Sequence, residues 1–153
     1  MLVPSLAKKI IKEVRRLIDE DIIIVDVAGT IIASTDSSRI GSFHEGALLS
    51  SQDQKKMIIT KEMENHLNGV KAGINLPIIY QHKVVGVIGI TGDPEKVSSY
   101  GELLKKMTEL LIQESYFAEQ MELESRALET FIFDWLHSKE ETLEFVKRAE
   151  HLN

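Results

Sequence analysis

Hydrophobic and polar positions follow a helical rhythm at the start of the chain. Leu6, Ile10, Val14 and Leu17 recur at helical spacing, with Lys and Arg residues between them. We therefore expect a first helix that Ser5 caps and that runs to about Asp19.

The pattern then changes to short apolar runs, which predict two β-hairpins. The first hairpin joins residues 22–26 to residues 31–35 through a turn that contains a glycine. The second joins residues 74–80 to residues 83–91 across only two residues, a length typical of a tight hairpin. Pro77 has no N–H group, so we expect its N side to face a sheet edge or a bulge.

Shorter elements are expected between the two hairpins. The pattern indicates helices over residues 44–52 and 61–67, and a strand over residues 57–60. Antiparallel strand pairs with helices outside them indicate an α+β fold. This is the pattern of small sensor domains of the PAS, GAF and Cache types, with an antiparallel sheet flanked by helices and a long C-terminal helix.

The helical rhythm returns at about Val97, and no Gly or Pro interrupts residues 102–136. Apolar residues recur there at alternating four- and three-residue steps. Glu114 and Glu124 occupy two positions of this repeat that would otherwise be apolar. The apolar positions are Leu103, Met107, Leu110, Phe117, Met121, Leu128, Phe131 and Trp135. A helix of about 35 residues is about 50 Å long, which exceeds what one small sheet needs. The 3.5-residue period predicts local pairing with the same helix of a second copy, and so a homodimer.

Composition narrows the functional classes. The 153 residues fit one domain, and the net charge of −6 argues against phosphate contacts with nucleic acid. The absence of cysteine excludes disulfides, thiolate zinc sites and Cys nucleophiles. The N-terminus lacks a signal-peptide pattern, and no apolar run approaches the roughly 20 residues of a membrane span. We expect a cytoplasmic protein that does not enter a membrane.

Catalytic chemistry is not visible in the sequence. Glu62, Glu64 and His66 are close together, but in a helix only Glu62 and His66 share a face, so a solvated helix face is the simpler interpretation. The histidines have no recognisable Ser or Cys partner for a triad, and the glycines of the last strand lack the residues of a phosphate loop. We expect no enzyme activity, no metal and no cofactor.

Three segments instead carry the groups that an organic acid needs. Cations or free N–H groups bind carboxylates, while amides and hydroxyls bind hydroxyl groups. The side chains of the right types are Arg39, His44, Lys71, Asn75 and Thr91. Each also has a structural interpretation: a surface charge, a structural hydrogen bond, or a polar group at a strand end.

These segments carry a resemblance to a known family. They are Arg39-Ile40-Gly41-x-x-His44-Glu45-Gly46-Ala47, Gly69-Val70-Lys71-x-Gly73-Ile74-Asn75-Leu76-Pro77 and Val84 to Glu95. They closely resemble the sugar-diacid recognition domain of the carbohydrate diacid regulator family of bacterial transcription regulators. Lys71 stands where relatives often carry Arg, which keeps the charge but loses bidentate geometry.

The resemblance implies a sensor domain over residues 1–136, with residues 137–153 a linker or the start of a next domain. It implies a cytoplasmic activator that responds to acids such as glycerate, galactarate or glucarate. DNA would be bound only through a C-terminal helix-turn-helix that is absent from this chain.

The predicted ligand site combines the motif positions with the chemistry of the side chains. It consists of Arg39, Gly41, His44, Glu45, Gly46, Lys71, Gly73, Asn75, Thr91 and Gly92. Binding of a small carboxylic acid there would change how the sensor core and the long helix relate, and so the dimer geometry. The main alternative is a dimerisation or scaffold module with a degenerate pocket, and an enzyme acting on such acids comes third.

Overall fold

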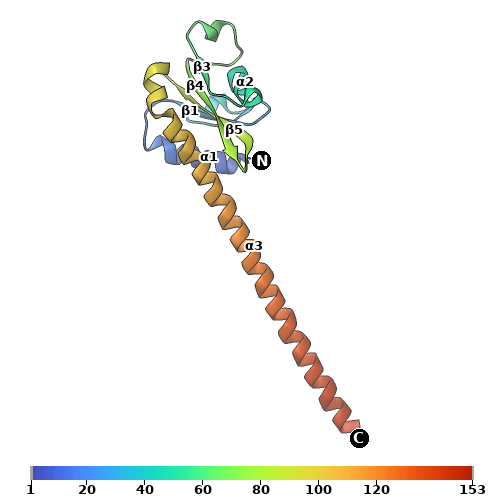
Figure 1. Cartoon of the computed structure of the whole chain (residues 1–153). Helices are drawn as coiled ribbons and strands as arrows, with labels where there is room; N and C mark the ends of the chain where they lie inside the picture. Colours follow the sequence, from blue (N-terminus) through green and yellow to red (C-terminus); the bar gives the residue numbers. More distant parts are fainter. Residues whose placement is uncertain (1, 153) are drawn as a thin grey trace. The chain divides into compact units, whose positions relative to one another are not determined.

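The computed structural model describes residues 2–152 and contains one five-stranded sheet with helices around it (Figure 1). The elements are α1 (Pro4–Arg15), β1 (Ile22–Val25), β2 (Ile31–Ser34), η1 (Ser37–Arg39), α2 (Glu45–Asp53), β3 (Met57–Ile59), η2 (Met63–Asn65), β4 (Gly73–Tyr80), β5 (Lys83–Thr91) and α3 (Pro94–Leu152). The strand order is β2-β1-β5-β4-β3, and every neighbouring pair is antiparallel. The predicted α+β fold, both hairpins and the third strand are confirmed.

The β4–β5 hairpin turns at Gln81 and His82, whose φ angles are 51° and 65°. A two-residue turn with both φ angles positive matches the right-handed twist of the strands it joins. The prediction for Pro77 is confirmed, because β3 pairs only with Gly73 to Asn75 and leaves the outer edge of β4 open at Pro77. The β4 ladder also shifts register between Ile78 and Ile79.

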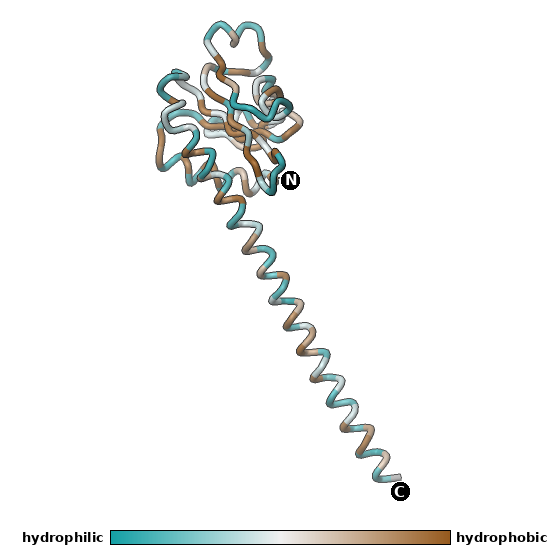
Figure 2. The backbone as a smooth tube through the Cα atoms, viewed as in Figure 1, coloured by the Kyte–Doolittle hydropathy of each residue, from teal (hydrophilic) through white to brown (hydrophobic). Residues whose placement is uncertain are grey.

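The sheet has two different faces. Under the first turns of α3, Gly101 lies against the side chains of Ile74 and Leu76. On the opposite face, Ala47 of α2 belongs to a buried cluster that includes Ile23 and Val87. Figure 2 shows the hydrophobic positions concentrated along the strands between these layers. We call these the α1/α3 face and the α2 face.

Two predicted helices differ from the structure at their ends. The first helix begins at Pro4 and ends at Arg15, so Ser5 lies inside it and does not cap it. Proline is favoured at the first helical position because its missing N–H needs no partner there. Residues 61–67 form only the single 3₁₀ turn Met63–Asn65, and the carboxylate of Glu64 accepts a hydrogen bond from the N–H of Ala72.

Helix α3 continues beyond the predicted end at residue 136, to Leu152. The chain divides into two compact units, Met1–Glu114 and Ser115–Asn153. In the second unit every residue from Phe117 to His151 is exposed, including the predicted pairing residues. No helix within residues 2–152 is both long and apolar enough to cross a membrane.

Candidate functional site

The start of α2 is fixed by hydrogen bonds to a distant loop. His44 is the N-cap, and its Nδ1 accepts a hydrogen bond from the N–H of Ala47 at 2.9 Å. The Glu45 carboxylate accepts the N–H of Asn68 at 2.7 Å, and the Glu45 N–H donates to the Asn68 carbonyl at 3.0 Å. These contacts hold the loop before β4 against the helix N-terminus.

Arg39 attaches the same loop from the other side. Its Nη2 donates to the Gly69 carbonyl at 2.9 Å. Gly69 has a φ of 72°, and a Cβ at this position would collide with the Phe43 carbonyl oxygen. Only glycine therefore allows the close approach of these two loops. Arg39 is partly buried, and this burial lowers its pKa because it disfavours the charged form.

Asn75 lies in the middle of the α2 face, between two glycines. The residue is 2% exposed. A Cβ on Gly46 would lie 3.2 Å from Asn75 Nδ2, and a Cβ on Gly89 would lie 2.8 Å from Asn75 Oδ1. Within residues 2–152 the buried side-chain polar atom without a hydrogen-bond partner is Tyr100 Oη, and neither polar atom of the Asn75 carboxamide is in that state.

His44 is held in its neutral form. Burial first, and then the positive charge of Arg39, lower its pKa to about 4. Because Nδ1 accepts a hydrogen bond, we assign the proton of the neutral ring to Nε2. Over the described residues neither Nε2–H nor the N–H of Gly46 has an acceptor.

We define the α2 N-terminal cluster as Arg39, His44, Gly46 and Asn75. It offers a guanidinium group, an imidazole N–H, a backbone N–H at a helix start and a carboxamide. Its donors outnumber its acceptors, and carboxylate oxygens are the acceptors that such groups bind most strongly. The donor types of the cluster are therefore those that an organic acid would need.

Other predicted residues lie in a separate, open pocket of about 790 Å³ at the end of the sheet. Lys71, Thr91 and Gly92 line this pocket, and we call it the Lys71 pocket. Its two lysines are outnumbered by three carboxylates; the charged lining residues are Lys61, Lys71, Glu64, Asp93 and Glu95. A dianion would gain little net attraction there.

Lys71 nevertheless acts electrostatically on the same carboxylate, that of Asp36, as Arg39 of the cluster does. Hydrogen bonds from Ser38 lower the pKa of Asp36, and the charges of Lys71 and Arg39 lower it further. Both cations therefore lie near the same carboxylate. Lys71 is exposed and belongs to the rim between the cluster and the Lys71 pocket.

The structure thus brings together Arg39, His44, Glu45, Gly46 and Asn75, and separates Lys71, Thr91 and Gly92 from them. Glu45 has its carboxylate engaged by Asn68. Gly41 is exposed, and a Cβ there would meet nothing within 4 Å. Gly73 has a structural explanation, because a Cβ there would collide with the Ile90 carbonyl oxygen.

Gly89 is the site residue that the sequence prediction omitted. It pairs directly with Asn75 across β4 and β5 and leaves room for the amide. The signal was a glycine inside an apolar strand, which indicates close approach of another group. In the part of the chain that the structure describes, no three His, Asp or Glu side chains are placed to hold a metal ion.

Comparison with known proteins identifies the family. Residues 2–135 match the family described as "Putative sugar diacid recognition". The chain is similar to the uncharacterized protein YsfB of Bacillus subtilis, with 49% identity over 151 residues, 99% of this chain and 41% of that protein. It is also similar to the carbohydrate diacid regulator of Escherichia coli, with 36% identity over 97% of this chain and 38% of that protein. The chain therefore spans about two fifths of the length of these relatives.

A solved structure supports the fold independently. The GAF domain of the Acinetobacter phosphoenolpyruvate-protein phosphotransferase aligns with a TM-score of 0.53, covering 76% of this chain and 86% of that domain. The sequence identity is 14%, so this similarity concerns the fold alone. It agrees with the sensor-type α+β fold that the sequence predicts.

Proposed function

The chain belongs to the sugar diacid recognition family, and from this premise we propose that it binds a small hydroxy-acid or sugar diacid through the α2 N-terminal cluster. Glycerate, galactarate and glucarate are the acids to test first. In a longer regulator the domain would act as a cytoplasmic sensor, and DNA would be bound through a C-terminal helix-turn-helix outside this chain.

The observation that supports this proposal most is the position of the Asn75 carboxamide beside Gly46 and His44 at the N-terminus of α2. A hydroxy-acid supplies both acceptors and donors, so it can satisfy the amide and the N–H groups of Gly46 and His44 together. Arg39 would bind one carboxylate, and the N-terminus of α2 adds a favourable field for the negative charge. Lys71 at the rim would attract the second carboxylate of a diacid.

Binding could be transmitted from the cluster to α3 through β4. Glu109 of α3 is buried, and its Oε2 accepts the N–H of Ile79 at 2.7 Å and the Lys105 ammonium at 2.7 Å. Ile79 follows the register shift of the strand that carries Asn75. A ligand that moves β4 would therefore change the hydrogen bond that joins it to α3. We propose that this changes the geometry of a homodimer paired through α3.

Calorimetry with the three acids, on the wild type and on Arg39→Ala, tests the site. We expect Arg39→Ala to weaken binding roughly 10- to 100-fold, because a hydrogen bond to a charged group contributes about 1.5–3 kcal/mol. Arg16→Ala is the matched control, since Arg16 is an exposed arginine directly after α1 that pairs with Glu13. A thermal-shift screen is a cheaper first step, because a ligand at 100 times its Kd adds roughly 2.7 kcal/mol of stability.

Two results would contradict the proposal in different ways. Equal affinity in Arg39→Ala and the wild type would remove Arg39 from the site. No binding of any of the acids at millimolar concentration would remove the ligand class.

The scaffold alternative has one observation in its favour. A Cβ on Gly46 would lie 2.8 Å from Ile59 Cδ1, and a Cβ on Gly89 would lie 2.7 Å from Ile23 Cγ1. The space beside Asn75 is thus largely filled by the protein's own side chains, and a bound acid requires the loops at the start of α2 to move outward. A domain that dimerises normally and shows no thermal shift with any acid would favour the scaffold.

A further inference from the structure

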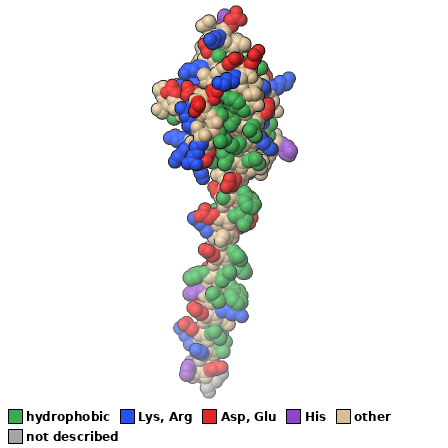
Figure 3. All heavy atoms as spheres, turned by 90° about the vertical axis from the view of Figure 1, so that its left-hand side faces the viewer, with side chains coloured by type: hydrophobic (Ala, Val, Ile, Leu, Met, Phe, Trp, Pro, Cys, Tyr) green, Lys and Arg blue, Asp and Glu red, His purple; other side chains and the backbone are tan. Residues whose placement is uncertain are grey.

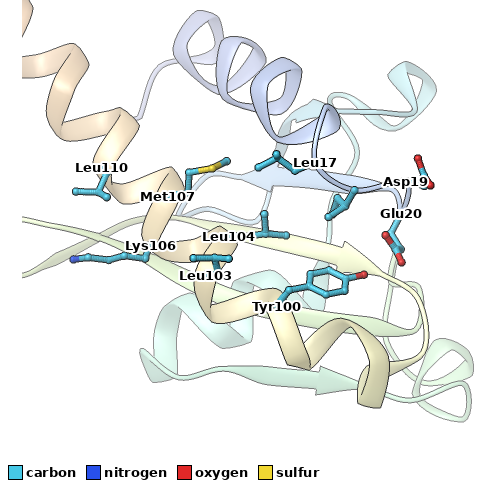
Figure 4. Close-up of a pocket in the computed structure, with 10 residues that line it drawn as sticks. Leu17, Asp19, Glu20, Tyr100, Leu103, Leu104, Lys106, Met107 and Leu110 are labelled. Carbon is cyan, nitrogen blue, oxygen red and sulfur yellow. The ribbon is translucent and has the colours of Figure 1, made fainter.

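An apolar groove of about 670 Å³ lies between the end of α1 and the first turns of α3, and the proposed ligand site does not use it. We call it the α1–α3 groove; its apolar lining residues are Leu17, Ile18, Tyr100, Leu103, Leu104, Met107 and Leu110. Figure 4 shows Leu17 and Met107 side by side across the groove. Leu17 is 63% exposed, Leu103 72% and Leu110 51%.

Leu17, Leu103 and Leu110 thus form a group of neighbouring large apolar side chains that are each more than half exposed. Figure 3 shows hydrophobic side chains gathered on this side of the first unit, with Lys and Arg side chains beside them. Contiguous apolar patches of this kind mark interaction sites. At the rim, Tyr100 points toward the Glu20 carboxylate without reaching full hydrogen-bond geometry (Figure 4). Burial, and then Glu20, raise the pKa of Tyr100 to about 12, so this side chain stays uncharged beside the groove.

The spacing of the groove residues points to a second copy as the occupant. Leu103, Leu110 and Phe117 follow one another at seven-residue steps, and so do Met121, Leu128 and Trp135. Leu103, Met107 and Leu110 are therefore the first positions of the repeat that predicts helix pairing. The groove residues and the later positions of the repeat belong to one pattern.

The charges around the groove are self-complementary. Asp19 and Lys106 line it, and within residues 2–152 neither side chain has an ion-pair partner. In a two-fold dimer the same patch meets itself, so a cation of one copy faces a carboxylate of the other. Asp19 and Lys106, one carboxylate and one ammonium without an ion pair within residues 2–152, fit such a contact.

We propose that a second copy of this chain packs its own α1–α3 groove against this one, so that Leu17, which follows α1, is part of the dimer interface and Lys106 of one copy pairs with Asp19 of the other. This rests on the proposed homodimer and extends it. Pairing through α3 alone would not involve Leu17, because Leu17 lies outside that helix. In the proposed arrangement the sensor core itself contacts its partner.

Analytical ultracentrifugation of the full 153-residue chain tests this arrangement. We expect Leu17→Lys to raise the dimer dissociation constant at least tenfold, since it places a charge in an apolar contact. Val27→Lys is the matched control: Val27 is 46% exposed in the turn between β1 and β2, away from the groove, and its substitution should leave the constant within twofold. Lys106→Glu should weaken the dimer, and Lys106→Glu combined with Asp19→Lys should restore it.

Every outcome decides between the proposals. A Leu17→Lys chain that dimerises like the wild type, while Leu103→Lys does not, would overturn the groove contact and leave pairing through α3. A wild type that is monomeric at 100 μM would overturn both dimer proposals. Acid binding by calorimetry is measured on the same variants, so failure of the ligand site would be seen separately.

Discussion

The two faces of the sheet come from the same strands but bury different chemistry. The α1/α3 face is closed by side chains such as Ile74 and Leu76, each 1% exposed and packed against Gly101. The α2 face places Asn75, one residue away along the strand, beside Gly46 and Gly89. Placing an amide in the middle of a face costs free energy that an apolar side chain there would not cost. The difference therefore separates the structural face from the face that carries the candidate site.

The largest expected effect comes from moving the amide to the wrong face. Ile74→Asn should lower the free energy of unfolding by about 4 kcal/mol, because it removes a buried apolar side chain and adds an unpaired polar group. Chemical denaturation measures this loss. A decrease below about 1 kcal/mol would show that the two faces tolerate polarity equally, and the comparison would fail.

The sequence predicted the fold better than the site. Two apolar runs separated by only two residues were enough to predict the β4–β5 hairpin. The start of the first helix was wrong because Pro4, not Ser5, opens it. The gathering of Arg39, His44 and Asn75 followed from local motifs near elements that the pattern placed. The separation of Lys71 from them depends on the path of the loop before β4. The residues of this loop show no helical or strand periodicity, so the sequence pattern could not predict that path.

A second prediction concerns pH and is specific to the α2 face. His44 has its pKa lowered to about 4 by burial, whereas an unfolded histidine titrates near 6.5. Between these values the unfolded chain binds a proton that the folded chain does not, so stability falls as pH falls from about 6.5 to 4. The loss should be roughly 3 kcal/mol.

His44→Asn isolates this contribution, because asparagine keeps an N-cap acceptor but does not titrate. We expect the variant to lose less stability than the wild type over that pH range, measured by urea denaturation at several pH values. Parallel pH curves for the two proteins would show that His44 is not the buried neutral group.

The third prediction concerns the link between β4 and the α1/α3 face. Glu109→Leu should lower the free energy of unfolding by about 2 kcal/mol, because the N–H of Ile79 and the Lys105 ammonium would both lose their buried acceptor. Glu109→Gln keeps an acceptor for Ile79 and should cost about half as much. If the proposed coupling holds, Glu109→Leu should bind acid normally but lose any effect of the acid on dimer affinity. An unchanged effect would exclude Glu109 from the coupling.

The smallest expected effect on stability comes from removing the amide where it naturally lies. Leucine has nearly the shape of asparagine, and it leaves no donor or acceptor unpaired between Gly46 and Gly89. We therefore expect Asn75→Leu to change the free energy of unfolding by less than about 1 kcal/mol, in contrast to the adjacent Ile74→Asn.

The same substitution should abolish stabilisation by acids, which in the wild type reaches roughly 2.7 kcal/mol at 100 times the Kd. Denaturation with and without acid measures both quantities on one protein. A loss above about 2 kcal/mol without acid would mean that the amide supports the fold, and retained stabilisation by acid would mean that the ligand binds elsewhere. Only the combination of an intact fold and a lost response identifies Asn75 as a group kept for a ligand.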